Sequence, residues 1–155
     1  MTEEIVNEEI KKTPEFVYVG VGVLIQNKQG KILLGRRHPD AKSETDNWEW
    51  QFPGGQLAYN ETCEDCAIRE VKERTGLDIS APEVFCANVE KAECVHWITV
   101  GLRATKFEGK PVAKNPAKHT EWKWFALDAL PENIFLPTAK EINKFKAIKD
   151  AKKKK

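Results

Sequence analysis

The sequence predicts an α/β fold in which a mixed β-sheet packs against helices. Strand-like patterns of β-branched residues occur both before and after one capped helix near the centre of the chain, at residues 62–76. A second helical pattern follows the last strand, at 138–149. Strands on both sides of a central helix, with a further helix at the end, favour an α/β sandwich.

The first half of the chain is predicted to hold three strands. Residues 16–26 alternate and are β-branched, which is typical of a buried strand. Turn-forming residues at 27–30 predict a β-hairpin to a return strand at 31–36. After a polar loop, a short strand at 48–52 leads into a proline-glycine-glycine turn.

The second half supplies three more strands. They are predicted at 84–89, 96–107 and 121–126. A lysine- and proline-rich loop separates the last two and ends at His119, and the last strand carries Trp122 and Trp124 on one face.

The 155 residues are predicted to form one domain, at 15–149. Residues 1–14 are acidic and polar and are expected to form a flexible arm, and the lysine-rich residues 150–155 a solvated basic tail. A hydrophobic content of 41% with 32% charged residues is ordinary for a soluble globular protein. The net charge of +1 gives no general attraction to nucleic acid or membrane, and we expect neither as a partner. No targeting signal or run of eighteen apolar residues is visible, so we expect a cytoplasmic protein.

The central helix carries charges where its apolar face should lie. Thr62 is a predicted N-cap and Gly76 a predicted left-handed C-terminal stop. At about 100° per residue, Cys66, Glu70 and Arg74 fall on the same side. Charges on a buried face must be paired, hydrated or bound to metal.

Residues 55–77 resemble the signature of the Nudix hydrolases, G-x5-E-x7-R-E-U-x-E-E-x-G-U, where U is aliphatic. Eight positions match: Gly55, Glu61, Arg69, Glu70, Val71, Glu73, Gly76 and Leu77. One departs, because Arg74 stands where the second glutamate of the E-E pair is expected. An ordinary surface helix with an Arg69–Glu73 pair would not explain why Glu70 lies on the apolar stripe.

The resemblance implies a Nudix-type α/β/α sandwich with a mixed β-sheet. It also implies Mg²⁺-dependent hydrolysis of a nucleoside diphosphate linked to another moiety, by water attack at phosphorus, with Mn²⁺ as an alternative ion. A small nucleotide or diphosphate is the expected partner, and a homodimer is left open. Two other functions stay open: a nucleotide-binding protein with reduced or lost hydrolysis, and a GDP-mannose-type hydrolase with His119 as base.

The resemblance also assigns roles to the matching residues. Glu70, Glu73 and Arg69 are the expected catalytic residues. Glu70, Glu73 and the carbonyl group of Gly54 are the expected metal ligands, because Mg²⁺ prefers oxygen. Gly55 and Glu61 are expected to support them.

Arg74 makes the expected site poorer in carboxylates, since a guanidinium cannot ligate a cation. The loop 115–119 also lacks the acidic residue that relatives often carry there. We expect either fewer metal ions, or a further ligand from Glu90 or Glu93. Alternatively, Arg74 binds phosphate directly, because its planar fork suits phosphate oxygens.

For the substrate we expect contacts from Arg74, Trp50, Gln51 and His119. The aromatic residues of strand 48–52 stack on a base or simply fill the core. Cys63 and Cys66 form a C-x-x-C pair, but inside a capped helix we expect reduced, buried thiols rather than zinc.

Overall fold

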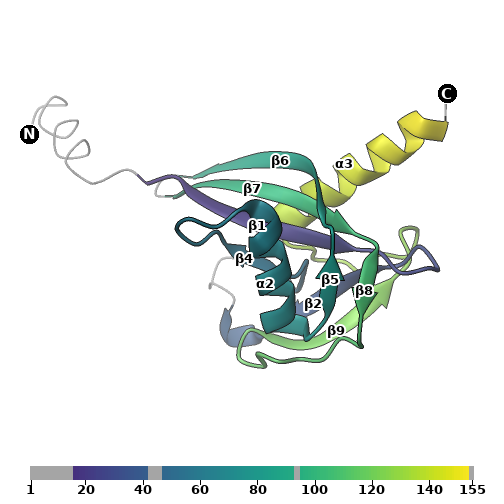
Figure 1. Ribbon diagram of the computed structural model, residues 1–155, viewed down its shortest axis with the longest axis horizontal. Coiled ribbons are helices and arrows are strands. Elements are labelled where there is room, and N and C mark those ends of the chain that lie inside the picture. Colours follow the sequence, from purple (N-terminus) through teal and green to yellow (C-terminus); the bar gives the residue numbers. More distant parts are fainter. Residues whose placement is uncertain (1–15, 42–46, 93–94, 154–155) are drawn as a thin grey trace, which may run out of the picture.

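The computed structural model describes residues 16–41, 47–92 and 95–153. Its strands form three sheets, drawn as arrows in Figure 1. The four-stranded sheet has the order β4-β1-β7-β6, the three-stranded sheet β3-β2-β9 and the two-stranded sheet β5-β8. The strands are β1 (Tyr18–Ile25), β2 (Ile32–Arg37), β3 (Trp50–Gln51), β4 (Gly54–Gln56), β5 (Asp78–Ser80), β6 (Glu83–Ala92), β7 (Val95–Ala104), β8 (Lys106–Glu108) and β9 (His119–Phe125).

The four-stranded sheet is mixed, as the sequence predicts. β1 runs parallel to β7, whereas β4 is antiparallel to β1 and β6 is antiparallel to β7. Helix α2 (Cys63–Thr75) and helix α3 (Leu136–Lys153) pack on this framework, and a short 3₁₀ turn, η1 (Pro39–Ala41), follows β2. None of the helices in the described ranges is long and apolar enough to cross a membrane.

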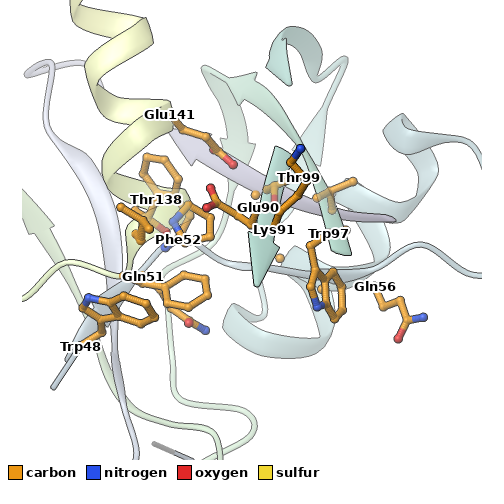
Figure 2. A pocket seen from close by; sticks show the side chains of 18 residues that line it. Trp48, Gln51, Phe52, Gln56, Glu90, Lys91, Trp97, Thr99, Thr138 and Glu141 are labelled. Atoms are coloured by element: carbon orange, nitrogen blue, oxygen red, sulfur yellow. Dashed lines mark hydrogen bonds between the residues drawn. The ribbon is translucent and has the colours of Figure 1, made fainter. Parts of the chain in front are cut away.

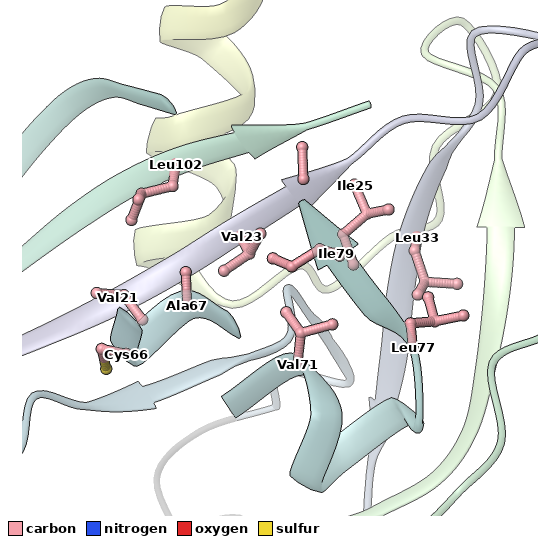
Figure 3. Packing of buried hydrophobic residues seen from close by; sticks show 11 residues of the cluster. Val21, Val23, Ile25, Leu33, Cys66, Ala67, Val71, Leu77, Ile79 and Leu102 are labelled. Atoms are coloured by element: carbon pink, nitrogen blue, oxygen red, sulfur yellow. The ribbon is translucent and has the colours of Figure 1, made fainter. Parts of the chain in front are cut away.

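Strand β1 lies between two hydrophobic clusters because its side chains alternate. Val21, Val23 and Ile25 join the cluster on the α2 side, shown in Figure 3, with Cys66, Ala67 and Val71 of the helix. Leu24 faces the other way and joins Ile142 and Phe145 of α3. The two helices therefore cover opposite faces, which makes the fold an α/β/α sandwich.

The predicted hairpin between β1 and β2 forms only at its turn. Only one isolated bridge, Gln26–Ile32, joins the two strands before they enter different sheets. The turn itself forms, since the Asn27 side chain accepts hydrogen bonds from the amides of Gln29 and Lys31. β1 pairs with β7 along its whole length and with β4 at Gly20–Gly22, whereas β2 pairs with β3 and β9.

Other element boundaries also differ from the prediction. The expected strand at 96–107 divides into β7 and β8, the strand at 84–89 is the longer β6, and β4 and β5 were not predicted. His119 opens β9 rather than ending a loop, and α3 continues to Lys153. The expected arm at 1–14, and Lys154 and Lys155, lie outside the described residues.

Candidate active site

Helix α2 has the predicted ends. Thr62 accepts a hydrogen bond from the amide of Asp65 at 3.1 Å, and Gly76 closes the helix in the left-handed conformation, with φ of 77°. The buried residues Cys66, Ala67, Glu70 and Val71 share one face of the helix. Glu70 is therefore a carboxylate on the apolar stripe, with 6% of its surface exposed.

Glu70 packs directly against the backbone of β4. A Cβ atom at Gly55 would overlap the Glu70 carboxylate. The neighbouring Gly54 is equally confined, because a Cβ atom there would overlap the carbonyl group of Val21. Two adjacent glycines thus let the edge strand of the sheet lie against the helix that carries the glutamates.

Arg69 ties the three glutamates of the signature together. Its Nε donates to Glu61 Oε2 at 2.8 Å, and its Nη1 donates to Glu70 Oε1 at 2.9 Å. The same Nη1 reaches Glu73 Oε2 at 3.4 Å, so the i,i+4 pair exists as one part of a larger network. The hydrogen bonds from Arg69 are the main reason that the pKa of Glu61 falls to about 2.

Arg74 lies beside Glu70, where the helical geometry predicts it. Its Nε donates to Glu70 Oε2 at 2.9 Å, and only 13% of its side chain is exposed. Its backbone carbonyl group accepts a hydrogen bond from Trp122 Nε1 of β9. Each oxygen of Glu70 therefore faces a guanidinium, Arg69 on one side and Arg74 on the other.

A cavity of about 680 Å³ opens on the other face of β4, and Figure 2 shows its lining. Its walls are largely apolar and include four aromatic side chains from segments far apart in the sequence: Trp48, Phe52, Trp97 and Phe135. Gly54, Gly55 and Gln56 of β4 also line it. The backbone of Gly55 thus contacts the cavity and also packs against Glu70.

The structure separates the residues predicted to contact substrate. Gln51 lines the cavity. Trp50 does not: it packs edge-on against Phe125 at 5.0 Å, in the cluster on the α3 side. Trp50 is therefore not part of this cavity lining, and its contact with substrate stays a prediction; Trp48 lines the cavity instead.

His119 lies behind Gln51, not at the cavity surface. It is 1% exposed, and its Nε2 is 2.6 Å from Gln51 Nε2. Burial, with Arg74, Arg37 and Lys118 nearby, lowers the pKa of His119 to about 3. A histidine this weakly basic is a poor general base near neutral pH, so the geometry does not favour the GDP-mannose-type alternative.

Two carboxylates, Glu90 and Glu141, lie in the cavity lining, and the sequence does not predict either of them there. Glu90, one of the two acids expected as a further metal ligand, lies within β6 and binds Lys140 of α3 at 2.8 Å. The other, Glu93, lies outside the described residues. Glu141, also on α3, is fully buried in the lining. Glu141 stands in a lysine-rich helix, and the neighbouring residues in the sequence do not indicate that its side chain is buried.

The oxygen donors near α2 are of the kind that Mg²⁺ binds, namely the carboxylates of Glu70 and Glu73 and the backbone carbonyl of Gly54. Glu73 is accessible, with 59% of its side chain exposed, but both oxygens of Glu70 are engaged by arginines. Within the described ranges, no three carboxylate, histidine or cysteine side chains lie close enough to hold a metal ion. A cation binding here must therefore compete with Arg74 for Glu70.

Comparisons with known proteins agree with this arrangement. The NUDIX domain family matches residues 18–150. An RNA pyrophosphohydrolase of Novosphingobium aromaticivorans is 25% identical over 133 residues, which cover 74% of this chain and 80% of that protein. An RNA pyrophosphohydrolase of Bartonella quintana is 31% identical over 142 residues, covering 74% and 79% respectively.

Solved structures show the same fold. A MutT NUDIX hydrolase from Burkholderia pseudomallei superposes with a TM-score of 0.75 at 29% identity, covering 84% of this chain and 98% of that one. A MutT protein from Methanosarcina mazei has a TM-score of 0.69 at 22% identity, covering 93% and 100%. The family match spans most of the chain and includes the whole network around Glu70. This chain belongs to the Nudix family and is a hydrolase that acts on phosphorus-containing anhydrides.

Proposed function

We propose that this chain is a Mg²⁺-dependent pyrophosphohydrolase that cleaves a nucleoside diphosphate linked to another moiety. Nucleoside triphosphates and related organic diphosphates are the substrates in view, and water attacks at phosphorus. The observation that carries the proposal is the position of Glu70, which is held against Gly55, a residue of the cavity lining. The cytoplasm, where nucleotides are abundant, is the compartment we expect for this activity.

The proposal divides the substrate between the two faces of β4. The organic group enters the cavity, where aromatic side chains replace its contacts with water. The phosphates extend past the glycine edge toward Glu70 and Glu73. Because β4 ends its sheet and carries glycines at this point, no side chain blocks that path at Gly54 or Gly55.

Glu70, Glu73 and the Gly54 carbonyl group are the residues that would hold magnesium. When bound, the ion neutralises phosphate oxygens and acidifies a coordinated water. Arg69 keeps the carboxylates in orientation through its hydrogen bonds to Glu61 and Glu70. Arg74 adds a positive charge that a phosphate oxygen can reach once Glu70 turns to the ion.

RNA carrying a 5′-triphosphate is a second candidate substrate. Several relatives at about 25–31% identity are RNA pyrophosphohydrolases, and this favours testing RNA beside free nucleotides. The net charge of +1 gives no general affinity for the RNA backbone, so we rank free nucleotides first.

The test is a Glu70→Gln variant assayed with Mg²⁺ on nucleoside triphosphates, nucleotide sugars, dinucleoside polyphosphates, prenyl diphosphates and a 5′-triphosphorylated RNA. The substitution removes the buried negative charge at nearly the same volume, so we expect a loss of turnover of about a hundredfold or more. Glu64→Gln is the matched control, because Glu64 is an exposed residue of the same helix and should keep wild-type rates. Turnover of Glu70→Gln close to wild type on the best substrate would refute the proposal.

A further inference from the structure

Glu141 is a buried acid without a partner. It lies on α3, has 1% of its surface exposed, and forms part of the cavity lining. Figure 2 shows its carboxyl group directed from the helix toward the cavity. Neither of its two oxygens has a hydrogen-bond partner among the described residues.

The surroundings of Glu141 are shaped for it but do not neutralise it. A Cβ atom at Gly22 would overlap its carboxyl group, and one at Gly101 would come within 3.2 Å of its Cδ atom. The two nearest lysines of the same helix bind elsewhere: Lys140 binds Glu90 at 2.8 Å and Lys144 binds the carbonyl group of Ala87 at 2.9 Å. An acid buried without a cation is held in its neutral form, and burial raises its pKa well above the ordinary value.

Such a group destabilises the fold while it lacks partners. A neutral carboxyl group presents a hydrogen-bond donor and an acceptor side by side in one plane. A ligand that pairs with both must have a planar edge with an acceptor next to a donor. Nucleobases have such edges, where a ring nitrogen or carbonyl acceptor lies next to an amino or ring N–H donor.

The cavity walls suit the flat faces of the same ligand. Trp48, Trp97 and Phe135 line the same cavity as Glu141. Figure 2 shows the rings of Trp48 and Trp97 in this lining. Trp97 is itself held by stacking on Tyr18, with ring centroids 5.0 Å apart. Aromatic side chains around one hydrogen-bonding pair are a common way to bind a base.

We propose that Glu141 recognises the nucleobase of the substrate through a paired donor and acceptor contact inside the aromatic cavity. The inference rests on the proposed function for the substrate class, and it adds the residue that reads the base. It also makes the cavity selective for substrates that contain a base over prenyl or sugar diphosphates.

The test is calorimetric binding of AMP, CMP, GMP and UMP, with ribose 5-phosphate as the probe that lacks a base. We expect at least one of the four nucleotides to bind about tenfold more tightly than ribose 5-phosphate. Glu141→Gln should keep this preference, because an amide also offers a donor beside an acceptor. Glu141→Met and Glu141→Asp should lose it, since one removes the polar group and the other withdraws it by one methylene.

Thermal melting separates recognition from a structural role. Glu141→Met should melt at or above the wild-type temperature while it binds the base more weakly, because it removes an unpaired buried group. Glu132→Gln, an exposed acid before α3, is the control and should change neither quantity. Equal binding of the preferred nucleotide by wild type and Glu141→Met, or no preference over ribose 5-phosphate in wild type, would overturn the proposal.

Nucleoside monophosphates contain no anhydride, so this experiment is independent of hydrolysis. Glu70→Gln should still bind the preferred nucleotide, because Glu70 lies on the other side of Gly55. Glu141-dependent binding without turnover of any diphosphate would refute only the proposed hydrolysis. Turnover that is insensitive to both Glu141→Met and the base would refute only the inference.

Discussion

Arg74 places a permanent positive charge against the buried carboxylate that the family signature assigns to metal binding. Its Nε lies 2.9 Å from Glu70 Oε2, with 13% of the Arg74 side chain exposed. At an effective dielectric constant of about 20, two unit charges about 4 Å apart interact by roughly 4 kcal/mol. Attraction of this size holds Glu70 to Arg74, and repulsion of similar size opposes a cation beside it.

We predict that Arg74→Glu tightens Mg²⁺ binding and raises hydrolysis of at least one diphosphate substrate. The substitution removes the guanidinium that competes for Glu70 and adds a carboxylate at the position where the family signature has one. Calorimetric titration with Mg²⁺ and a steady-state assay measure the two effects separately. Affinity should rise about tenfold or more, since each factor of ten corresponds to only about 1.4 kcal/mol.

Lys72→Glu is the charge-matched control for Arg74→Glu. Lys72 is exposed on the same helix and binds Asp78, so its reversal alters the net charge equally without touching Glu70. If Arg74→Glu binds metal more tightly but turns over more slowly, Arg74 acts as a phosphate clamp. If neither quantity moves, the Arg74–Glu70 contact has no influence on the site.

The junction between β4 and α2 depends on close approach of a strand to a helix. A Cβ atom at Gly55 would occupy the position of the Glu70 carboxylate. We therefore predict that Gly55→Ala displaces Glu70, lowers turnover by about a hundredfold or more and weakens Mg²⁺ binding, while the protein stays folded. Steady-state assays, metal titration and circular dichroism test the three parts.

Gly30→Ala separates this effect from a general cost of removing glycine. Gly30 has φ of 79° in the turn between β1 and β2, and a Cβ atom there would make only an ordinary van der Waals contact, at 3.8 Å from Gln26 Nε2. Alanine there should destabilise the protein by about 1 kcal/mol and leave turnover unchanged. Wild-type turnover in Gly55→Ala would mean that Glu70 has room to move without loss of function.

Across the whole molecule, the sequence predicts best what is decided locally. The limits of α2 follow from the Thr62 cap and the Gly76 stop, and the contact between Arg74 and Glu70 follows from their spacing on that helix. Each depends on residues within one or two turns. Local geometry therefore determines most of the half of the site that carries Glu70 and Glu73.

The cavity half could not be predicted, because it depends on which strands share a sheet. The turn at 27–30 is compatible with a hairpin, but β1 pairs with β4 and β7 while β2 pairs with β3 and β9 in another sheet. Trp48, Trp97 and Glu141 meet in the cavity only through that topology. The alternation of side chains also gives no prediction at β3, because a strand of two residues is too short to show whether Trp48 or Trp50 lines the cavity.

Glu61 and Glu141 should make the free energy of unfolding depend on pH in opposite directions. The pKa of Glu61 falls from 4.5 to about 2 on folding, chiefly through Arg69, so this group stabilises the fold above pH 4.5 and ceases to do so as pH falls toward 2. The pKa of Glu141 rises on folding because of burial, so this group destabilises the fold above pH 4.5 and not below it.

We predict that at pH 7 Glu141→Gln is more stable than wild type, and Glu61→Gln less stable. Glutamine does not titrate, so each variant lacks one of the two contributions. The advantage of Glu141→Gln should shrink as the pH falls from 7 and be gone by about pH 4.5. The deficit of Glu61→Gln should begin to shrink only below pH 4.5 and persist toward pH 2. Urea denaturation of the three proteins from pH 7 to pH 2.5 measures this order directly. Parallel stability curves for wild type and Glu141→Gln would mean that Glu141 ionises freely in the folded protein, and its neutral pairing with a base would fail with them.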